Sequence, residues 1–116
     1  MTVPDETRRR VQALDLRVRI ETVAHDAYFW ACPGAPGRER KIKTLARLAF
    51  VYQVAGPARI GEATGVIRLA RHVYGRTSDV LHGRASHLNL PEAVVGEWRA
   101  AVEQLELLCD TESPNA

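Results

Sequence analysis

The chain has 116 residues, a formal net charge of +2 and 46% apolar side chains. This length fits one domain, residues 1–116, and this apolar share excludes an intrinsically disordered chain. No apolar run approaches the roughly 20 residues that span a bilayer, and the first residues do not form a secretory signal. We therefore expect a cytoplasmic domain without membrane contact. Cys32 and Cys109 are expected as reduced thiols, and a bridge between them is the alternative.

The charges are distributed unevenly along the chain. Residues 1–90 carry 15 basic and 8 acidic side chains, whereas residues 91–116 carry one basic and six acidic side chains. This asymmetry predicts one of two arrangements. Either the basic part binds a polyanionic partner, or it pairs with the acidic final segment within the fold.

The first predicted element is a long helix over residues 5–31. Asp5 is expected to cap it, and Glu6 suits the positive end of the helix dipole. Apolar residues three and four apart predict a buried stripe. Its members are Leu16, Ile20, Val23, Ala27 and Trp30. Alternating apolar residues over 14–20 also fit a strand, but the helical stripe is longer and no second strand is available to pair with it. His25, beside the stripe, is interpreted as a structural histidine with one hydrogen-bonded nitrogen.

Two prolines and two glycines in residues 32–37 predict a break in the chain. A second helix is expected over about 38–55, with a basic start. Gly56 and Pro57 end it. Its predicted apolar face comprises Ile42, Leu45, Leu48, Ala49, Tyr52 and Val54.

The third predicted helix runs from about residue 60 to His82, and Gly83 fits the left-handed cap that follows a helix. Two stripes lie along it. The apolar stripe comprises Val66, Ala70, Val73, Thr77 and Leu81, and the polar stripe comprises Arg68, His72, Arg76 and Asp79.

The fourth predicted helix begins at Leu90-Pro91-Glu92, where proline is tolerated in the first turn. Its broad apolar face comprises Val94, Val95, Trp98, Ala101, Val102, Leu105 and Leu108. The four segments together predict an all-α, four-helix bundle.

The end of the third helix carries the candidate chemistry. A guanidinium holds a phosphate in a fixed fork, and an imidazole moves protons near neutral pH, so Arg76 and His82 together suit phosphodiester chemistry. Asp79 lies three residues from each and is within reach of both. The simpler interpretation is a surface ion pair between Arg76 and Asp79 and a histidine that merely ends the helix.

The end of the third helix carries one motif, in which Tyr74 precedes Arg76, the polar Thr77 follows it, and five residues separate Arg76 from the pair His82-Gly83. In this motif and in its order of helices, the chain resembles the HEPN superfamily of small helical domains. The helix order covers most of the chain, whereas the sharp motif covers about ten residues. The resemblance implies a metal-independent endoribonuclease of the toxin or phage-defence type, active as a homodimer. His82 would shuttle protons and Arg76 would stabilise the phosphorane-like charge.

The resemblance also implies alternatives, because some members only bind nucleic acid or a partner protein such as an antitoxin. Threonine at position 77 departs from the strongly polar residue that is common after the arginine, which puts catalysis in doubt more than the fold. Arg68, His72 and Arg84 are the expected RNA-binding residues beside the catalytic set of Arg76, Asp79 and His82.

Three other interpretations compete. Residues 60–66 resemble the turn of a helix-turn-helix, which would present Arg68, Arg71 and His72 to duplex DNA. The arginines of the first helix could grip phosphates, but a solvated face explains them more simply. His82 and His87 do not share a helical face and lack a cluster of further ligands, so no metal and no cofactor is expected.

Overall fold

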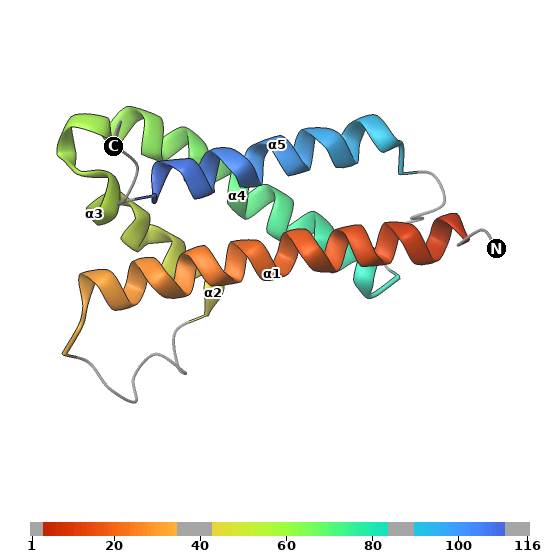
Figure 1. The fold of residues 1–116 in the computed structure, drawn as a ribbon, viewed down its shortest axis with the longest axis horizontal. Helices are drawn as coiled ribbons and strands as arrows, with labels where there is room; N and C mark the ends of the chain where they lie inside the picture. The colour runs from red at the N-terminus through yellow and green to blue at the C-terminus, as the bar shows by residue number, and fades with distance from the viewer. Residues whose placement is uncertain (1–3, 35–42, 84–89, 111–116) are drawn as a thin grey trace.

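The computed structural model describes residues 4–34, 43–83 and 90–110. Within them the chain is entirely helical (Figure 1), which confirms the all-α prediction. Three helices are long: α1, α4 and α5. The elements are α1 (Asp5–Ala31), α2 (Thr44–Arg47), the 3-10 turn η2 (Leu48–Phe50), α3 (Val51–Ala55), the 3-10 turn η3 (Pro57–Arg59), α4 (Ile60–Leu81) and α5 (Glu92–Leu108).

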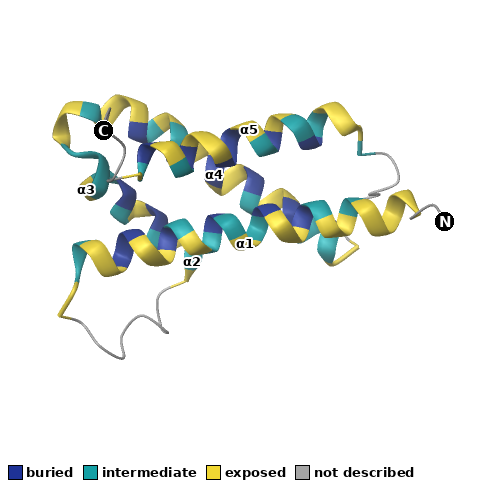
Figure 2. Cartoon of the chain, in the orientation of Figure 1, coloured by how far each residue is buried: buried dark blue, intermediate teal, exposed yellow. Residues whose placement is uncertain are grey.

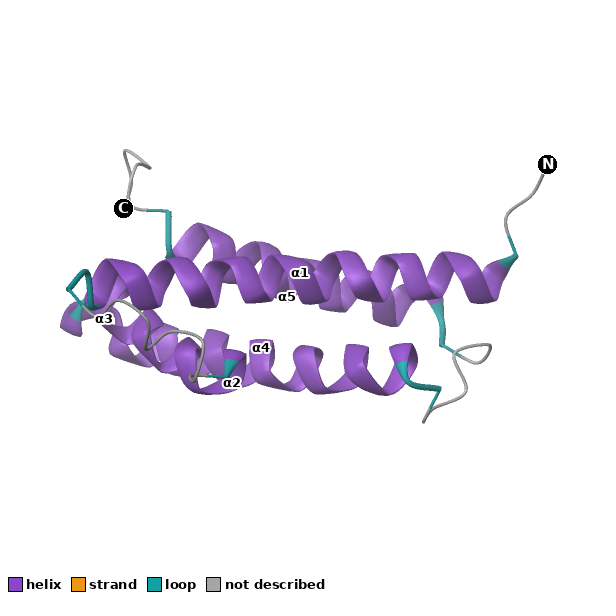
Figure 3. Ribbon diagram, turned by 90° about the horizontal axis from the view of Figure 1, so that it is seen from below, coloured by secondary structure: helices purple, strands orange, loops and turns teal. Residues whose placement is uncertain are grey.

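The helices form two layers (Figure 3). One layer contains α1 and α5, which run in the same direction, and the other contains α4 with the short helices α2 and α3. Because α4 runs antiparallel to α1 and α5, its C-terminal end lies beside the start of α1. The helix α1 packs against all the other helices and is the central element of the bundle.

Dark blue in Figure 2 marks the core, which runs along the facing sides of the long helices. It is built from small and branched apolar side chains of every long helix. Its largest fully buried members are Leu16, Ile20, Leu48, Val51, Ile67, Val73, Thr77, Val95, Val102 and Leu105. Small residues such as Ala24, Ala63 and Ala70, all 0% exposed, let the helices approach closely.

The predicted helix over 5–31 is confirmed with its bounds, and the strand interpretation is wrong. Its buried stripe is confirmed at Leu16, Ile20 and Ala27. Trp30 is a correction, because its side chain is 57% exposed. A helix of 27 residues is about 40 Å long, and α5 with 17 residues is about 26 Å, so the last turn of α1 extends beyond its neighbour.

The start of α1 differs from the prediction at one residue. Pro4 takes the cap position, and Asp5 is the first helical residue without a capping hydrogen bond. Its carboxylate instead pairs with Arg8 one turn later. The negative charge of Asp5 and Glu6 still suits the positive end of the helix.

The predicted second helix is shorter and interrupted. Lys43 is extended, so the helix begins at Thr44 rather than Arg38, and residues 38–42 lie outside the described part. The 3-10 turn advances about 120° per residue instead of 100°, which rotates the apolar face. Val51 is therefore buried although it was not predicted, whereas Leu45 is 44% exposed.

The third predicted helix is confirmed as α4, with His82 as its C-cap and Gly83 in the left-handed region at φ 69°. The helix is continuous through Gly61 and Gly65. The helix-turn-helix interpretation is therefore wrong, because no turn separates a first helix from a recognition helix in this segment.

The fourth predicted helix is confirmed as α5, with Pro91 as its N-cap. Val95, Trp98, Ala101, Val102, Leu105 and Leu108 of its predicted apolar face are buried, and Val94 is partly buried. Among the described residues, none of the helices combines the length and the apolar character that crossing a membrane requires.

Candidate functional site

A pocket of about 480 Å³ lies on the exposed side of α4, where α4 meets α1 and α2. Three arginines and a histidine line it, together with a single carboxylate. The lining residues are Arg17, Leu45, Arg71, His72, Tyr74, Gly75, Arg76, Ser78 and Asp79. We call it the basic pocket. Its excess of guanidinium groups makes it attractive to anions.

Arg17 reaches the basic pocket from α1. Its guanidinium lies over the ring of Tyr74, 4.0 Å from the ring centroid, and its Nη1 donates to the Tyr74 carbonyl at 3.4 Å. The Tyr74 hydroxyl in turn donates to Glu21 Oε2 at 3.2 Å. The ring and the carbonyl thus hold Arg17 at the pocket, with most of its five N–H donors still available.

Arg71 and Arg76 enter the basic pocket from α4 itself. Arg71 donates from Nε and Nη2 to the carbonyl of Leu45 at 3.2 and 3.1 Å, which joins α4 to α2. Arg76 Nη1 donates to Asp79 Oδ2 at 3.3 Å, an exposed pair one helical turn apart. These contacts orient both guanidinium groups and leave further donors for a ligand.

The expected catalytic set is only partly brought together. Arg76 and Asp79 pair in the basic pocket, as their spacing predicted. His82 is exposed at the C-cap of α4 and does not line the pocket. Six helical residues rotate the chain by about 240°, so the two side chains leave α4 on different sides.

The expected RNA-binding residues have different positions. His72 lines the basic pocket, and Arg68 is exposed on α4 outside it. Arg84 lies outside the described residues. Thr77 is 0% exposed, and its hydroxyl donates to the Tyr74 carbonyl at 2.8 Å. The polar residue that follows Arg76 therefore belongs to the core and does not face the pocket.

Sequence reasoning did not assign Arg17 to the site. It lies 57 residues from Tyr74 along the chain, among arginines that were interpreted as a solvated face. Only the packing of α1 on α4 brings the two residues together. Arg71 was singled out only for the DNA-binding alternative. Five residues rotate α4 by about 140°, so the helical period does not predict that Arg71 and Arg76 line the same pocket.

Other arginines of α1 are used within the fold. Arg9 Nη1 pairs with Glu92 Oε2 at 2.5 Å, and Arg19 makes two hydrogen bonds to Glu106 at 2.6 and 3.0 Å. The hydrogen bonds that Arg19 donates to Glu106 raise the pKa of Arg19, against the opposing effect of burial. Arginines of the first helix therefore pair with glutamates of the acidic last helix along one layer, which confirms the intramolecular alternative for these residues.

No group of three or more potential metal ligands occurs within the part of the chain that the structure describes. Cys32 and Cys109 are both free thiols, and burial raises the pKa of Cys109 to about 11. His25 Nδ1 contacts Arg47 Nη1 at 3.3 Å, in line with one hydrogen-bonded ring nitrogen, although its side chain is exposed.

A scan against protein-family models, a search of curated proteins and a search of solved structures each found no match.

Proposed function

We propose that this protein binds single-stranded RNA, with phosphate groups held in the basic pocket. The observation that supports this proposal is the convergence of Arg17, Arg71 and Arg76 from two helices on one cavity. Guanidinium groups bind phosphate oxygens in a planar fork, and each of these three is already positioned by a contact within the fold.

Single-stranded RNA fits this pocket better than a duplex. Unpaired bases stack on histidine rings and guanidinium planes, and both groups line the cavity through His72 and Arg17. The pocket spans only part of α4, so it has room for a short stretch of the RNA backbone but not for a double helix. The arginines provide affinity for phosphates and the planar groups provide stacking.

A titration of fluorescein-labelled single-stranded RNA in EDTA tests the proposal at several salt concentrations. Replacing Arg71 and Arg76 by alanine together should weaken binding about tenfold and lower the salt slope by about 1.4, since each single-strand phosphate contact contributes about 0.7. Arg10→Ala is the matched control, because Arg10 is exposed on α1 outside the pocket. Equal losses in the control and the double variant would contradict an RNA site in the pocket.

Endoribonuclease activity in a HEPN-like homodimer is the second candidate. Arg76 and His82 are both exposed near the C-terminal end of α4. Because the two side chains leave α4 on different sides, a two-fold mate would have to bring His82 of one copy to Arg76 of the other.

In that reaction a 2′-hydroxyl attacks the adjacent phosphorus. One histidine accepts the hydroxyl proton, Arg76 stabilises the charge on the phosphorane, and an imidazolium protonates the departing 5′ oxygen. The products are a cyclic 2′,3′-phosphate and a 5′-hydroxyl. No metal is needed for these steps.

Incubation of the protein with RNA in EDTA separates the two candidates. Cleavage that is lost in His82→Ala supports the endoribonuclease, and a mixture of inactive His82→Ala and Arg76→Ala chains tests pairing across a dimer. Salt-sensitive binding without cleavage supports the binding module. Cleavage that persists in His82→Ala excludes His82 as the proton shuttle.

A further inference from the structure

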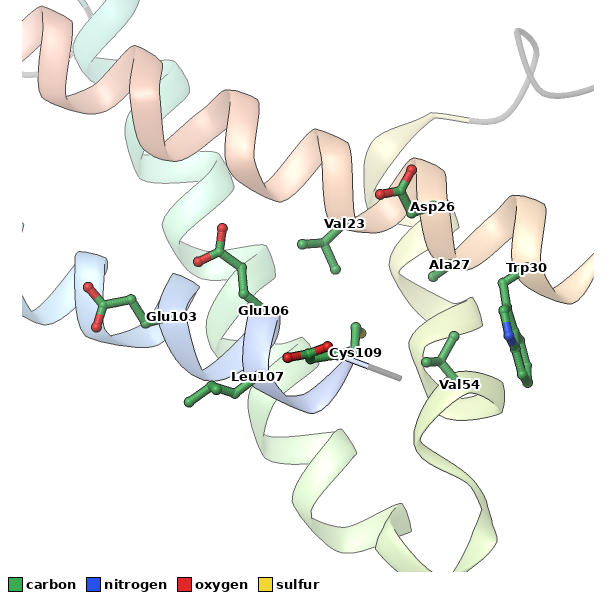
Figure 4. Close-up of a pocket in the computed structure, with 10 residues that line it drawn as sticks. Val23, Asp26, Ala27, Trp30, Val54, Glu103, Glu106, Leu107 and Cys109 are labelled. Carbon is green, nitrogen blue, oxygen red and sulfur yellow. The ribbon is translucent and has the colours of Figure 1, made fainter. Parts of the chain in front are cut away.

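A second and larger pocket, of about 710 Å³, lies between the C-terminal half of α1, α3 and the end of α5 (Figure 4). It shares no lining residue with the basic pocket. Its lining residues are Val23, Asp26, Ala27, Trp30, Val54, Glu103, Glu106, Leu107, Cys109 and Asp110. We call it the acidic pocket. Its volume is within the range of sites that bind small organic molecules.

One part of the acidic pocket is apolar. Figure 4 shows Val23 and Ala27 on α1 beside Val54 on α3, with the Trp30 indole at one side and Leu107 at the other. Trp30 is 57% exposed and Leu107 is 67% exposed. Large apolar side chains exposed around a cavity indicate a surface that gains from being covered.

The polar part is entirely acidic. Four carboxylates line the pocket, and none of its lining residues is basic. Glu106 is held by Arg19 through two hydrogen bonds. Asp26 and Glu103 have no ion-pair partner among the described residues. A cavity with one sign of charge and apolar walls concentrates its field on a ligand of the opposite sign.

The carboxylates are too dispersed for a metal ion. No group of three or more potential ligands, these residues included, is close enough to hold one within the described ranges. Figure 4 shows Asp26 on α1 and Glu103 on α5 at opposite sides of the pocket, so a ligand that reaches both is larger than an ion and has its body along the apolar wall.

We propose that the acidic pocket binds an organic cation with an aliphatic body and two ammonium groups. The aliphatic body packs on Val23, Val54 and Leu107, and the ammonium groups pair with Asp26 and Glu103. The indole of Trp30 adds a cation–π contact at the rim. This site is independent of RNA binding, because it uses different residues at a different place on α1.

The test is a titration of the ¹⁵N-labelled protein with 1,6-diaminohexane, followed through the two indole N–H signals. Trp30 reports on the pocket, and Trp98, which is 6% exposed in the core, reports on the fold. The diamine should shift the Trp30 signal in a saturable manner and leave Trp98 unchanged. The neutral 1-hexanol, which has the same aliphatic length, should bind more weakly.

Charge-neutral variants test the carboxylates. Asp26→Asn and Glu103→Gln should each weaken diamine binding about fivefold and leave binding of 1-hexanol unchanged. Glu97→Gln is the matched control, because Glu97 is exposed on α5 outside the pocket. The proposal is overturned if 1-hexanol binds as tightly as the diamine, if Glu97→Gln has the same effect as Glu103→Gln, or if the Trp30 signal does not respond.

Discussion

Arg17 lies over the ring of Tyr74, with 4.0 Å between its guanidinium carbon and the ring centroid, and this contact joins α1 to α4 at the basic pocket. The contact gives Arg17 a fixed position that its place in the sequence does not suggest.

Arg17→Ala should weaken single-stranded RNA binding about fivefold and lower the salt slope by about 0.7, because one phosphate contact is lost. Tyr74→Phe keeps the ring and the carbonyl, so it should leave RNA affinity within twofold, although it loses the hydroxyl bond to Glu21. Tyr74→Leu removes the stacking ring and should resemble Arg17→Ala. Fluorescence anisotropy at several salt concentrations measures all three, and an unchanged slope in Arg17→Ala would remove Arg17 from the site.

Substitutions of Thr77, the residue after Arg76, test whether its side chain belongs to the core. Thr77→Val keeps the shape and loses one hydrogen bond, so the free energy of unfolding should fall by no more than about 1 kcal/mol. Thr77→Asn introduces a larger polar group at a position that is 0% exposed, and should cost about 1–3 kcal/mol. Urea unfolding followed by circular dichroism measures both. A stable Asn variant with increased RNA cleavage would show instead that this side chain reaches the site.

Substitution of Glu106 tests how far the ion pair between α5 and Arg19 of α1 stabilises the fold. Glu106→Gln should lower the free energy of unfolding by about 1 kcal/mol, because both partners are partly exposed and water screens the pair. Glu103→Gln, three residues earlier and without an ion pair, should change it by less than about 0.5 kcal/mol. A double-mutant cycle with Arg19→Ala isolates the interaction, and a coupling energy near zero would mean that the pair does not stabilise the bundle.

Two glycines should respond to alanine in opposite ways. Gly56 has φ 87° and ψ 162°, a conformation that an alanine side chain disfavours, so Gly56→Ala should destabilise the fold by about 1–3 kcal/mol. Gly65 lies inside α4 with no atom within 4 Å of an added Cβ, and Gly65→Ala should stabilise it by about 0.5–1 kcal/mol. Thermal unfolding measures the change in stability of each variant. A change of the same sign in both variants would contradict the left-handed conformation of Gly56 at the end of α3.

Cys109 gives a pH dependence with a definite sign. Burial raises the pKa of its thiol from 9.0 to about 11, and the nearby Arg59 opposes this shift more weakly. At pH 8 its thiolate fraction, and with it the rate of alkylation by iodoacetamide, should be about 100-fold below that of the unfolded chain.

The same shift is linked to stability. The folded state holds this proton more tightly, so the stabilisation is complete below pH 9 and is lost as the pH rises towards 11. Denaturant unfolding at pH 8 and pH 10.5 should show a smaller decrease for Cys109→Ala than for the native chain. An equal decrease in both proteins would mean that another group causes the pH dependence.

Local patterns in the sequence were sufficient for the helices and for contacts along one helix. Spacings of three and four residues predicted the buried face of α5, the buried Ala70, Val73 and Thr77 on α4, and the pair of Arg76 with Asp79, because the helical period alone makes such residues neighbours. The cap at Gly83 was predicted from the left-handed conformation that glycine adopts after a helix. The face of the α2–α3 segment was predicted only in part: Leu48 is buried and Tyr52 and Val54 are partly buried, whereas Leu45 and Ala49 are exposed. The 3-10 turn changes the helical period within this segment.

Contacts between helices were decided by the tertiary structure. How α1 lies against α3, α4 and α5 decides four features of the molecule. These are the contact of Arg17 with Tyr74, the pairing of Arg19 with Glu106, the exposure of Trp30 and the acidic pocket. Sequence spacing carries no information on the offset and direction with which two helices pack, because many side-chain arrangements bury the same apolar stripe. The amino-acid sequence thus determined which residues form each helix and which sides of them are apolar, and packing determined which charged groups meet.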